Sequence, residues 1–138
     1  MQFSQIEKIN AEDTWEIRHK VMWPNKDIDY VKLNNDKSGF HYGIVEDGQI
    51  ISVISLFIEG DRAQFRKFAT LVDKQGQGYG SRLLDFVMGE ALKLGVRYIW
   101  CNAREEKKEL YKKFGMIETE ERFEKGGIEY IIMGKILS

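Results

Sequence analysis

The chain has 138 residues, of which 43% are hydrophobic and 12% aromatic, enough to build the core of one compact domain spanning residues 1–138. Its 21 basic and 22 acidic residues leave a formal net charge of -1, which argues against a nucleic-acid-binding protein. One cysteine excludes an internal disulfide framework and a multi-cysteine zinc site. No apolar run is long enough to cross a bilayer, so we expect a cytoplasmic protein that needs no membrane and no metal.

The first half of the chain predicts short elements and then an antiparallel meander. A strand over 3–9 precedes a helix over 13–22, for which Asp13 or Thr14 is the expected cap and Pro24 the end. A second short helix is expected near 28–33. Strands over 42–46 and 49–58 should pair around Asp47-Gly48, a strong hairpin signal, and a turn over 59–62 leads into a strand over 64–72.

The second half predicts a parallel crossover. Six apolar residues repeat at helical spacing and mark the buried face of a helix that Gly95 ends: Leu83, Leu84, Val87, Met88, Ala91 and Leu92. A nearly continuous apolar strand over 96–101 follows, so strand, helix and strand imply a parallel pair. A short helix over 105–114 and two strands over 116–123 and 128–137, paired across 124–127, complete the chain.

The segment Gln75-Gly76-Gln77-Gly78-Tyr79-Gly80 lies directly behind a predicted strand and directly ahead of the predicted helix. Glycines let the backbone bend tightly and turn its N–H groups outward, and the new helix offers unpaired amides and the positive end of its dipole. The segment therefore predicts a site for a phosphate or another anion.

The chain resembles the GNAT superfamily of N-acetyltransferases. Gln75, Gly78 and Gly80 match the family's glycine motif at its fixed positions, and Leu110-Tyr111-Lys112-Lys113-Phe114-Gly115-Met116 follows at a spacing similar to the family's. The resemblance covers the chain well from about residue 49 onward and the first half by element order. It implies a single α/β domain with a mixed, mostly antiparallel central sheet of six to seven strands, flanked by helices, with a splay between the fourth and fifth strands.

The resemblance also implies acetyl-coenzyme A as co-substrate and transfer of its acetyl group to a primary amine of a small molecule or peptide, by direct attack in a ternary complex. Amides of the glycine segment would hold the pyrophosphate, and the ends of the two splayed strands would bind the pantetheine arm. The cofactor-binding residues expected on this basis are Phe68, Ala69, Thr70, Gln75, Gly76, Gln77, Gly78, Tyr79, Gly80, Ser81 and Asn102, the last at a strand end.

Tyr111 matches the tyrosine with which the family protonates the departing thiolate. A phenol with a pKa of about 10 stays protonated at neutral pH and can supply that proton. The alternative is an amphipathic core tyrosine that packs beside Leu110 and Phe114.

The general base is less clear from the sequence. Many family members carry a glutamate on the fourth strand, and the matching position here is Gln64, which cannot take a proton at neutral pH. The acceptor could be weakly basic, or the proton could pass through water to His41 or Glu59.

Other conspicuous residues have structural explanations. Cys101 lies in an apolar strand and is expected to be a small buried hydrophobe. The alternating charges over 104–113 are typical of a solvated helix face. Arg18 and Trp23 flank the first helix, in the region that forms one wall of the acceptor pocket in members of the family.

Two other functions remain open from the sequence. One is a noncatalytic acyl-coenzyme A binding or sensing module, favoured by the missing acid at Gln64 and opposed by the retained Tyr111. The other is an interaction domain in which the glycines serve only a tight turn. The apolar run over 130–133 also suggests a strand edge shared in a homodimer.

Overall fold

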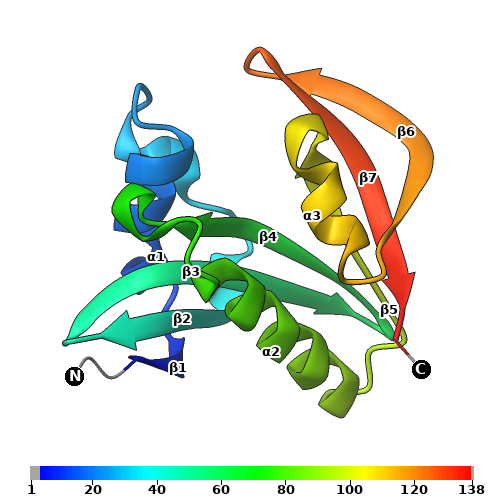
Figure 1. Ribbon diagram of the computed structural model, residues 1–138, viewed down its shortest axis with the longest axis horizontal. Coiled ribbons are helices and arrows are strands. Elements are labelled where there is room, and N and C mark those ends of the chain that lie inside the picture. Colours follow the sequence, from blue (N-terminus) through cyan, green and yellow to red (C-terminus); the bar gives the residue numbers. More distant parts are fainter. Residues whose placement is uncertain (1–3, 138) are drawn as a thin grey trace.

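The computed structural model of the chain describes residues 4–137 and contains one seven-stranded sheet in the order β1-β2-β3-β4-β5-β7-β6 (Figure 1). The strands are β1 (Ser4–Ile9), β2 (Phe40–Glu46), β3 (Gln49–Glu59), β4 (Arg62–Thr70), β5 (Tyr98–Arg104), β6 (Ile117–Lys125) and β7 (Ile128–Ile136), and the helices are α1 (Glu12–Ile17), α2 (Tyr79–Lys93) and α3 (Lys108–Lys112). The predicted mixed sheet is confirmed, since β4 and β5 are parallel and the other pairs antiparallel. Phe3, the first residue of the predicted first strand, lies outside the described residues.

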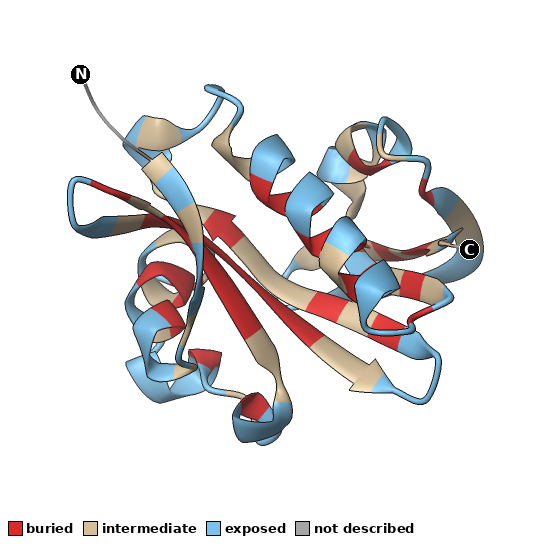
Figure 2. Cartoon of the chain, turned by 90° about the horizontal axis from the view of Figure 1, so that it is seen from below, coloured by how far each residue is buried: buried red, intermediate tan, exposed pale blue. Residues whose placement is uncertain are grey.

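Helices cover both faces of the sheet, and Figure 2 shows the buried residues along the central strands and on the inner sides of the helices. The larger core lies between the sheet and α2 and includes Tyr111 of α3, whereas a smaller one joins Ile17 of α1 to Val53 and Ala69. Helix α2 buries five of the six residues predicted from its periodicity. Leu92 is 51% exposed, so its assignment to the buried face was wrong.

The predicted hairpin between β2 and β3 is confirmed. Asp47 and Gly48 have φ values of 51° and 78°, as the two central residues of a type I′ turn require. Strand β4 begins two residues earlier than predicted and ends at Thr70, because a 3₁₀ turn over Val72–Lys74 follows it.

The first helix begins earlier than expected and changes its pitch. Its N-cap is Ala11, so Asp13 and Thr14 lie in the first turn and neither is the cap. The Asp13 carboxylate instead accepts a hydrogen bond from the Asn10 N–H, and the Thr14 hydroxyl donates one to the Ala11 carbonyl. After Ile17 the helix continues as a π-helical turn over Arg18–Met22, which brings Arg18 into full burial.

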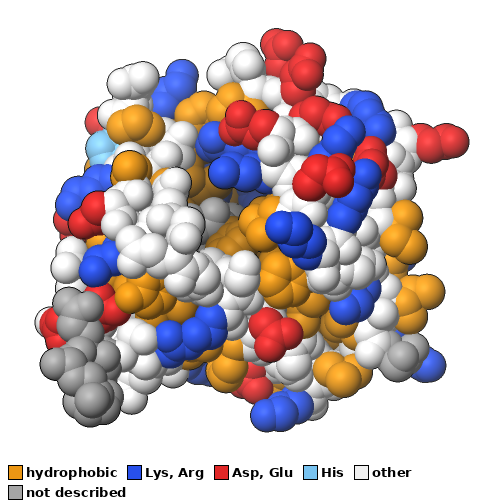
Figure 3. All heavy atoms as spheres, viewed as in Figure 1, with side chains coloured by type: hydrophobic (Ala, Val, Ile, Leu, Met, Phe, Trp, Pro, Cys, Tyr) orange, Lys and Arg blue, Asp and Glu red, His pale blue; other side chains and the backbone are white. Residues whose placement is uncertain are grey.

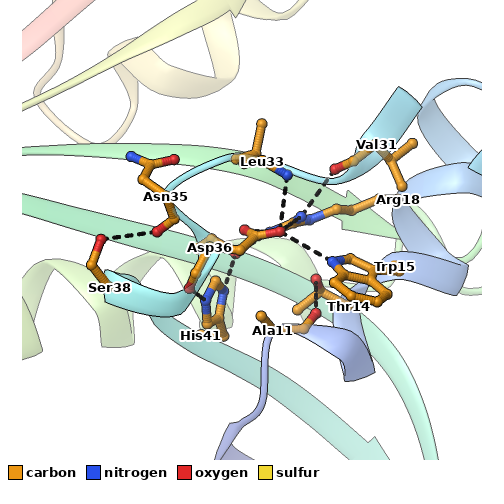
Figure 4. A network of polar contacts seen from close by, with 11 residues as sticks. Ala11, Thr14, Trp15, Arg18, Val31, Leu33, Asn35, Asp36, Ser38 and His41 are labelled. Carbon is orange, nitrogen blue, oxygen red and sulfur yellow. Dashed lines mark hydrogen bonds and ion pairs between the residues drawn. The ribbon is translucent and has the colours of Figure 1, made fainter. Parts of the chain in front are cut away.

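A buried ion pair joins this helix to the sheet (Figure 4). Arg18 donates two hydrogen bonds to Asp36, at 2.9 and 3.0 Å, and further bonds to the Val31 carbonyl and the Ser55 hydroxyl. Burial alone would raise the pKa of Asp36, but hydrogen bonds from Arg18, the Leu33 N–H and Trp15 outweigh it and lower that pKa. The pair therefore fixes α1 and the 31–38 segment against β3.

Of the last two strands, β7 is interior to the sheet and β6 is at its edge. β7 lies between β5 and β6 and pairs with both, so residues 130–133 are interior to the sheet. The two edge strands are β1 and β6. Residues 130–133 themselves have no free hydrogen-bonding side, so an edge that this strand pair shares in a homodimer would have to be β6, and the homodimer stays a prediction.

Candidate active site

A cavity of about 520 Å³ opens where β4 and β5 diverge. The two strands pair in parallel only from Arg62 and Tyr98 to Gln64 and Trp100; beyond these residues β4 stays on β3 and β5 stays on β7. The predicted splay is thus present. In the view of Figure 3 a hollow lies near the middle of the face, with hydrophobic side chains inside it and basic side chains beside it.

The glycine segment forms one end of this cavity. Gly76, Gly78, Gly80 and Ser81 line it, and α2 begins at Tyr79 with Gly78 as N-cap. Gly78 has φ of 90°, a left-handed conformation that disfavours any residue with a side chain, and a Cβ there would meet no atom within 4 Å. The helix N-terminus therefore faces open space, which suits an anion.

Gly80 is small for a different reason. A Cβ at Gly80 would lie 3.2 Å from Cζ of Phe68 and 3.5 Å from Oγ1 of Thr70. The absent side chain lets the first turn of α2 pack on the end of β4.

Three other residues of the segment stabilise the loop. The Gln75 amide donates a hydrogen bond of 2.9 Å to the Thr70 carbonyl, and the Gln77 amide donates one of 3.0 Å to the Asp73 carbonyl. The Tyr79 hydroxyl donates to Glu46, whose pKa is lowered by hydrogen bonds from Lys74 and Tyr79. Of the three, only Gln75 also lines the cavity.

Strand β4 contributes a bulge that the sequence analysis missed. β3 has one residue between Val53 and Ser55, whereas β4 has two between Arg66 and Ala69, and Lys67 adopts φ of 55°. The predicted residues Phe68, Ala69 and Thr70 all line the cavity; Phe68 belongs to the bulge, and the other two follow it.

Strand β5 lines the cavity with Cys101 and Asn102. We had predicted Asn102 at the end of the strand. β5 continues to Arg104, so Asn102 is instead an exposed residue within the strand. Cys101 is buried, and burial raises the pKa of its thiol. It is thus the inert small hydrophobe expected.

Tyr111 lies in α3 and lines the same cavity. Its side chain is packed against Phe65 of β4, with ring centroids 5.8 Å apart, and the residue is only 9% exposed. Burial, reinforced by neighbouring Cys101, raises the pKa of Tyr111, so the phenol is protonated throughout the neutral range.

The residues considered as general base lie elsewhere. Gln64 and Glu59 line a separate hollow with Trp100 and Arg62, and neither lines the cavity of Tyr111. His41 is buried, and its ring nitrogens lie 2.7 Å from the Ser55 hydroxyl and 2.7 Å from the Asp36 carbonyl (Figure 4).

Basic residues gather at the other end of the cavity, beside the π-helical turn that contributes Val21 and Met22. Arg66 and Lys67 line it there. The pKa of Lys67 is lowered to about 8, mainly by burial and next by the charge of Arg66. Neither residue was predicted as part of the site, although two adjacent cations in an otherwise half-apolar strand are visible in the sequence.

Residues 4–137 contain no cluster of three or more His, Cys, Asp or Glu side chains placed to hold a metal ion. Within the same range, no helix has the length and apolar character needed to span a membrane.

Comparison with known proteins identifies the family. A family model described as the acetyltransferase (GNAT) domain matches residues 15–137. The chain is 35% identical over 143 aligned residues to the uncharacterized N-acetyltransferase YitI of Bacillus subtilis, with 96% of each chain covered. It is 30% identical over 124 residues to the ribosomal protein bS18-alanine N-acetyltransferase of Haemophilus influenzae, covering 86% of this chain and 83% of the relative.

Solved structures agree at the level of the fold. The ribosomal-protein-S18-alanine N-acetyltransferase of Escherichia coli superposes with a TM-score of 0.82 at 20% identity, covering 99% of this chain and 95% of that one. A GNAT family acetyltransferase from Elizabethkingia anophelis with acetyl-CoA bound gives a TM-score of 0.76 at 18% identity, covering 96% and 97%. The family match over nearly the whole chain and these folds lead to one conclusion: the chain belongs to the GNAT family of acetyltransferases.

Proposed function

We propose that this protein transfers the acetyl group of acetyl-coenzyme A to a primary amine of a small molecule or peptide. The observation that carries the proposal is that the glycine turn at the start of α2 and Tyr111 of α3 line one cavity. An anion site and a buried acid are thereby combined beside a strand with free backbone groups. Relatives at 35% and 30% identity are both named N-acetyltransferases.

The described residues fit the coenzyme. Gly78 would present its amide and those of the first turn of α2 to the pyrophosphate, because nothing fills the space where its side chain would be. The edge of β4 over Phe68–Thr70 has no strand partner on the β5 side and would pair with the amides of the pantetheine arm. Bound there, the coenzyme supplies an activated thioester.

The reaction needs one new bond and one broken bond. The neutral amine attacks the thioester carbonyl, the N–C bond forms and the C–S bond breaks. Tyr111 donates its proton to the departing thiolate and is reprotonated from solvent, while the new amide loses the amine's extra proton. Backbone N–H groups at the bulge of β4 would polarise the carbonyl.

Removal of the amine's proton is assigned to solvent. Glu106 is the one carboxylate that lines the cavity among residues 4–137, and it is exposed at the rim. An alkyl ammonium with a pKa near 10 is neutral in only about a thousandth of its molecules at pH 7, so rates with such acceptors should rise with pH.

The first experiment is thermal unfolding with and without acetyl-coenzyme A, with desulfo and dephospho forms of the coenzyme as controls. A ligand that binds only the folded state raises the midpoint in proportion to the logarithm of its concentration. A rise justifies an amine screen by free-thiol release. No rise at saturating concentration would contradict the proposal and favour glycines that serve only the turn.

A noncatalytic acyl-coenzyme A sensor is the second candidate. It is favoured by Gln64, which stands where many relatives of the superfamily carry an acid. The sensor predicts stabilisation by the coenzyme but no thiol release with any amine, whereas the enzyme predicts both.

A further inference from the structure

The lining of the cavity has an excess of positive charge. Its charged lining residues are Arg66, Lys67, Lys74, Arg104, Lys107 and Glu106. Lys74 lies beside the glycine turn and forms an ion pair of 2.8 Å with Glu46. The remaining four cations line the cavity together with a single carboxylate, so its lining is electropositive.

Arg66 and Lys67 are the most costly of these charges. Both are partly buried, and neither has a carboxylate of the described residues within 4 Å. Burial lowers the pKa of each, and the neighbouring cations lower it further. A desolvated cation without a partner destabilises the fold, so a pair of them indicates a site that a ligand completes.

The acid that acts on both cations is already engaged. Asp36 counteracts the lowering of both pKa values, but its carboxylate is bonded through both oxygens to Arg18 and also accepts from Trp15 and Leu33. Arg18 itself repels both cations, and Lys125 repels Lys67. Counting these neighbours, four cations surround one carboxylate.

The two cations lie toward the acceptor side of the cavity. The glycine turn packs on Phe68 and Thr70. Thr70 pairs with Ser52 and Arg66 with Ser55, three residues apart on β3, so Arg66 lies about 10 Å back along β4 from Thr70. Tyr130 of β7 lines the cavity, and the β6–β7 hairpin also packs on the first helical region, because a Cβ on Gly126 would lie 2.8 Å from the Trp23 ring. Lys125, next to Gly126, does not line the cavity, but its charge lies near enough to lower the pKa of Lys67.

We propose that the acceptor is a small primary amine that also bears an anionic group, a carboxylate or a phosphate, and that Arg66 and Lys67 bind this group. The inference rests on the proposed acetyl transfer and names its substrate class. The planar guanidinium of Arg66 can hold two oxygens at once, and Lys67 adds a second charge-assisted hydrogen bond. A cavity of about 520 Å³ that also receives the pantetheine arm leaves room for a small acceptor.

The test compares acceptors that differ only in the anion. γ-Aminobutyrate is paired with γ-aminobutyramide, L-leucine with L-leucinamide, and O-phosphoethanolamine with ethanolamine, and free thiol is measured. The anionic member of at least one pair should have a kcat/KM roughly tenfold or more above its partner, the effect of one charge-assisted hydrogen bond. The carboxylate and phosphate pairs distinguish the two anions.

Three variants connect the preference to the two cations. Arg66→Met and Lys67→Met should each raise the KM of the anionic acceptor roughly tenfold and leave the KM of acetyl-coenzyme A unchanged. Lys93→Met is the matched control, because Lys93 lies at the end of α2 with its side chain 80% exposed. It should change neither constant.

A binding measurement separates this inference from the proposed function. The same compounds are titrated calorimetrically into protein saturated with coenzyme A. Binding of anionic amines that Lys67→Met weakens roughly tenfold would support the anion site even if no amine is acetylated. The proposal is overturned if the neutral members bind and react as well as the anionic ones, if no anionic amine binds, or if the variants weaken only acetyl-coenzyme A.

Discussion

The ring of Tyr111 lies 5.8 Å, centroid to centroid, from the ring of Phe65, at an interplanar angle of 45°. Phe65 is the first residue of β4 beyond the last pair with β5. The contact therefore anchors α3 at the point where the two strands part. The proposed acid is held by packing against the sheet, and its position should not depend on the coenzyme.

The variant Tyr111→Phe should separate chemistry from binding. Phenylalanine retains the packing on Phe65 but cannot donate a proton, so kcat should fall by about 10² or more, the usual contribution of a general acid. The affinity for acetyl-coenzyme A should be unchanged, as measured by thermal shift. A kcat equal to that of the wild type would remove Tyr111 from the mechanism.

Two alanine substitutions in the same turn and helix should have opposite effects. Gly78→Ala puts a Cβ on a residue with φ of 90°, which costs about 1–2 kcal/mol in stability and distorts the amides that face the anion. Acetyl-coenzyme A should bind more weakly. Gly89→Ala, in the interior of α2 with open space around its Cβ, should instead stabilise the fold by about 0.5–1 kcal/mol and leave affinity unchanged.

Chemical denaturation and coenzyme titration measure both effects. If Gly78→Ala lost stability but kept full affinity, the positive φ would be needed only for the turn. The anion site would then have to lie elsewhere in the cavity.

Breaking the buried pair should be costly. Asp36→Asn leaves the fully buried Arg18 without a counter-charge, so the free energy of unfolding should fall by about 3–5 kcal/mol at pH 7. The pKa of Asp36 is lowered in the folded state, so its stabilisation is complete above its ordinary value of 3.8 and is lost as the pH falls through the lower folded value. The difference between variant and wild type should therefore shrink in acid.

Urea unfolding at several pH values tests this. The exposed ion pair of Lys20 and Glu16 supplies the control, since Glu16→Gln should cost at most about 0.5 kcal/mol. Equal costs for the two variants would show that the buried pair contributes no more than a surface pair.

The sequence predicted correctly those elements that are determined by interactions between residues close together in the chain. The apolar spacing of α2 and the Asp47-Gly48 turn depend on residues within a few positions of one another, and both were confirmed. The crossover to β5 followed from the order of the elements. The order of β5, β7 and β6 could not be predicted, because it depends on pairing between distant strands.

The parts of the candidate site that lie in a sequence motif were predicted. The parts that depend on how β4 pairs with β3 were missed. The bulge at Lys67 puts Phe65 and Phe68 on the same face, three residues apart, where a regular strand would put them on opposite faces. That spacing is visible in the sequence, but without a glycine nothing marked it as a bulge. The pairing of Arg18 with Asp36 spans 18 residues of irregular chain and gave no signal.

The last prediction concerns the stability cost of Lys67. Its pKa is lowered from 10.5 to about 8, so below pH 8 the folded state carries a partly buried charge that faces Arg66, Lys125 and Arg18, with Asp36 the one opposing acid. Between pH 8 and 10.5 the unfolded state binds more protons than the folded state, and stability rises with pH through this group.

Lys67→Met should therefore raise the stability by about 1–2 kcal/mol at pH 7, and its advantage over the wild type should diminish toward pH 10. Melting temperatures of both proteins across this range give the comparison. An anionic amine should stabilise the wild type more than the variant, because only the wild type has the unpaired charge to neutralise. If Lys67→Met were instead less stable at pH 7, the lysine would already have a partner in the fold, and its charge would not indicate a site for an anionic ligand.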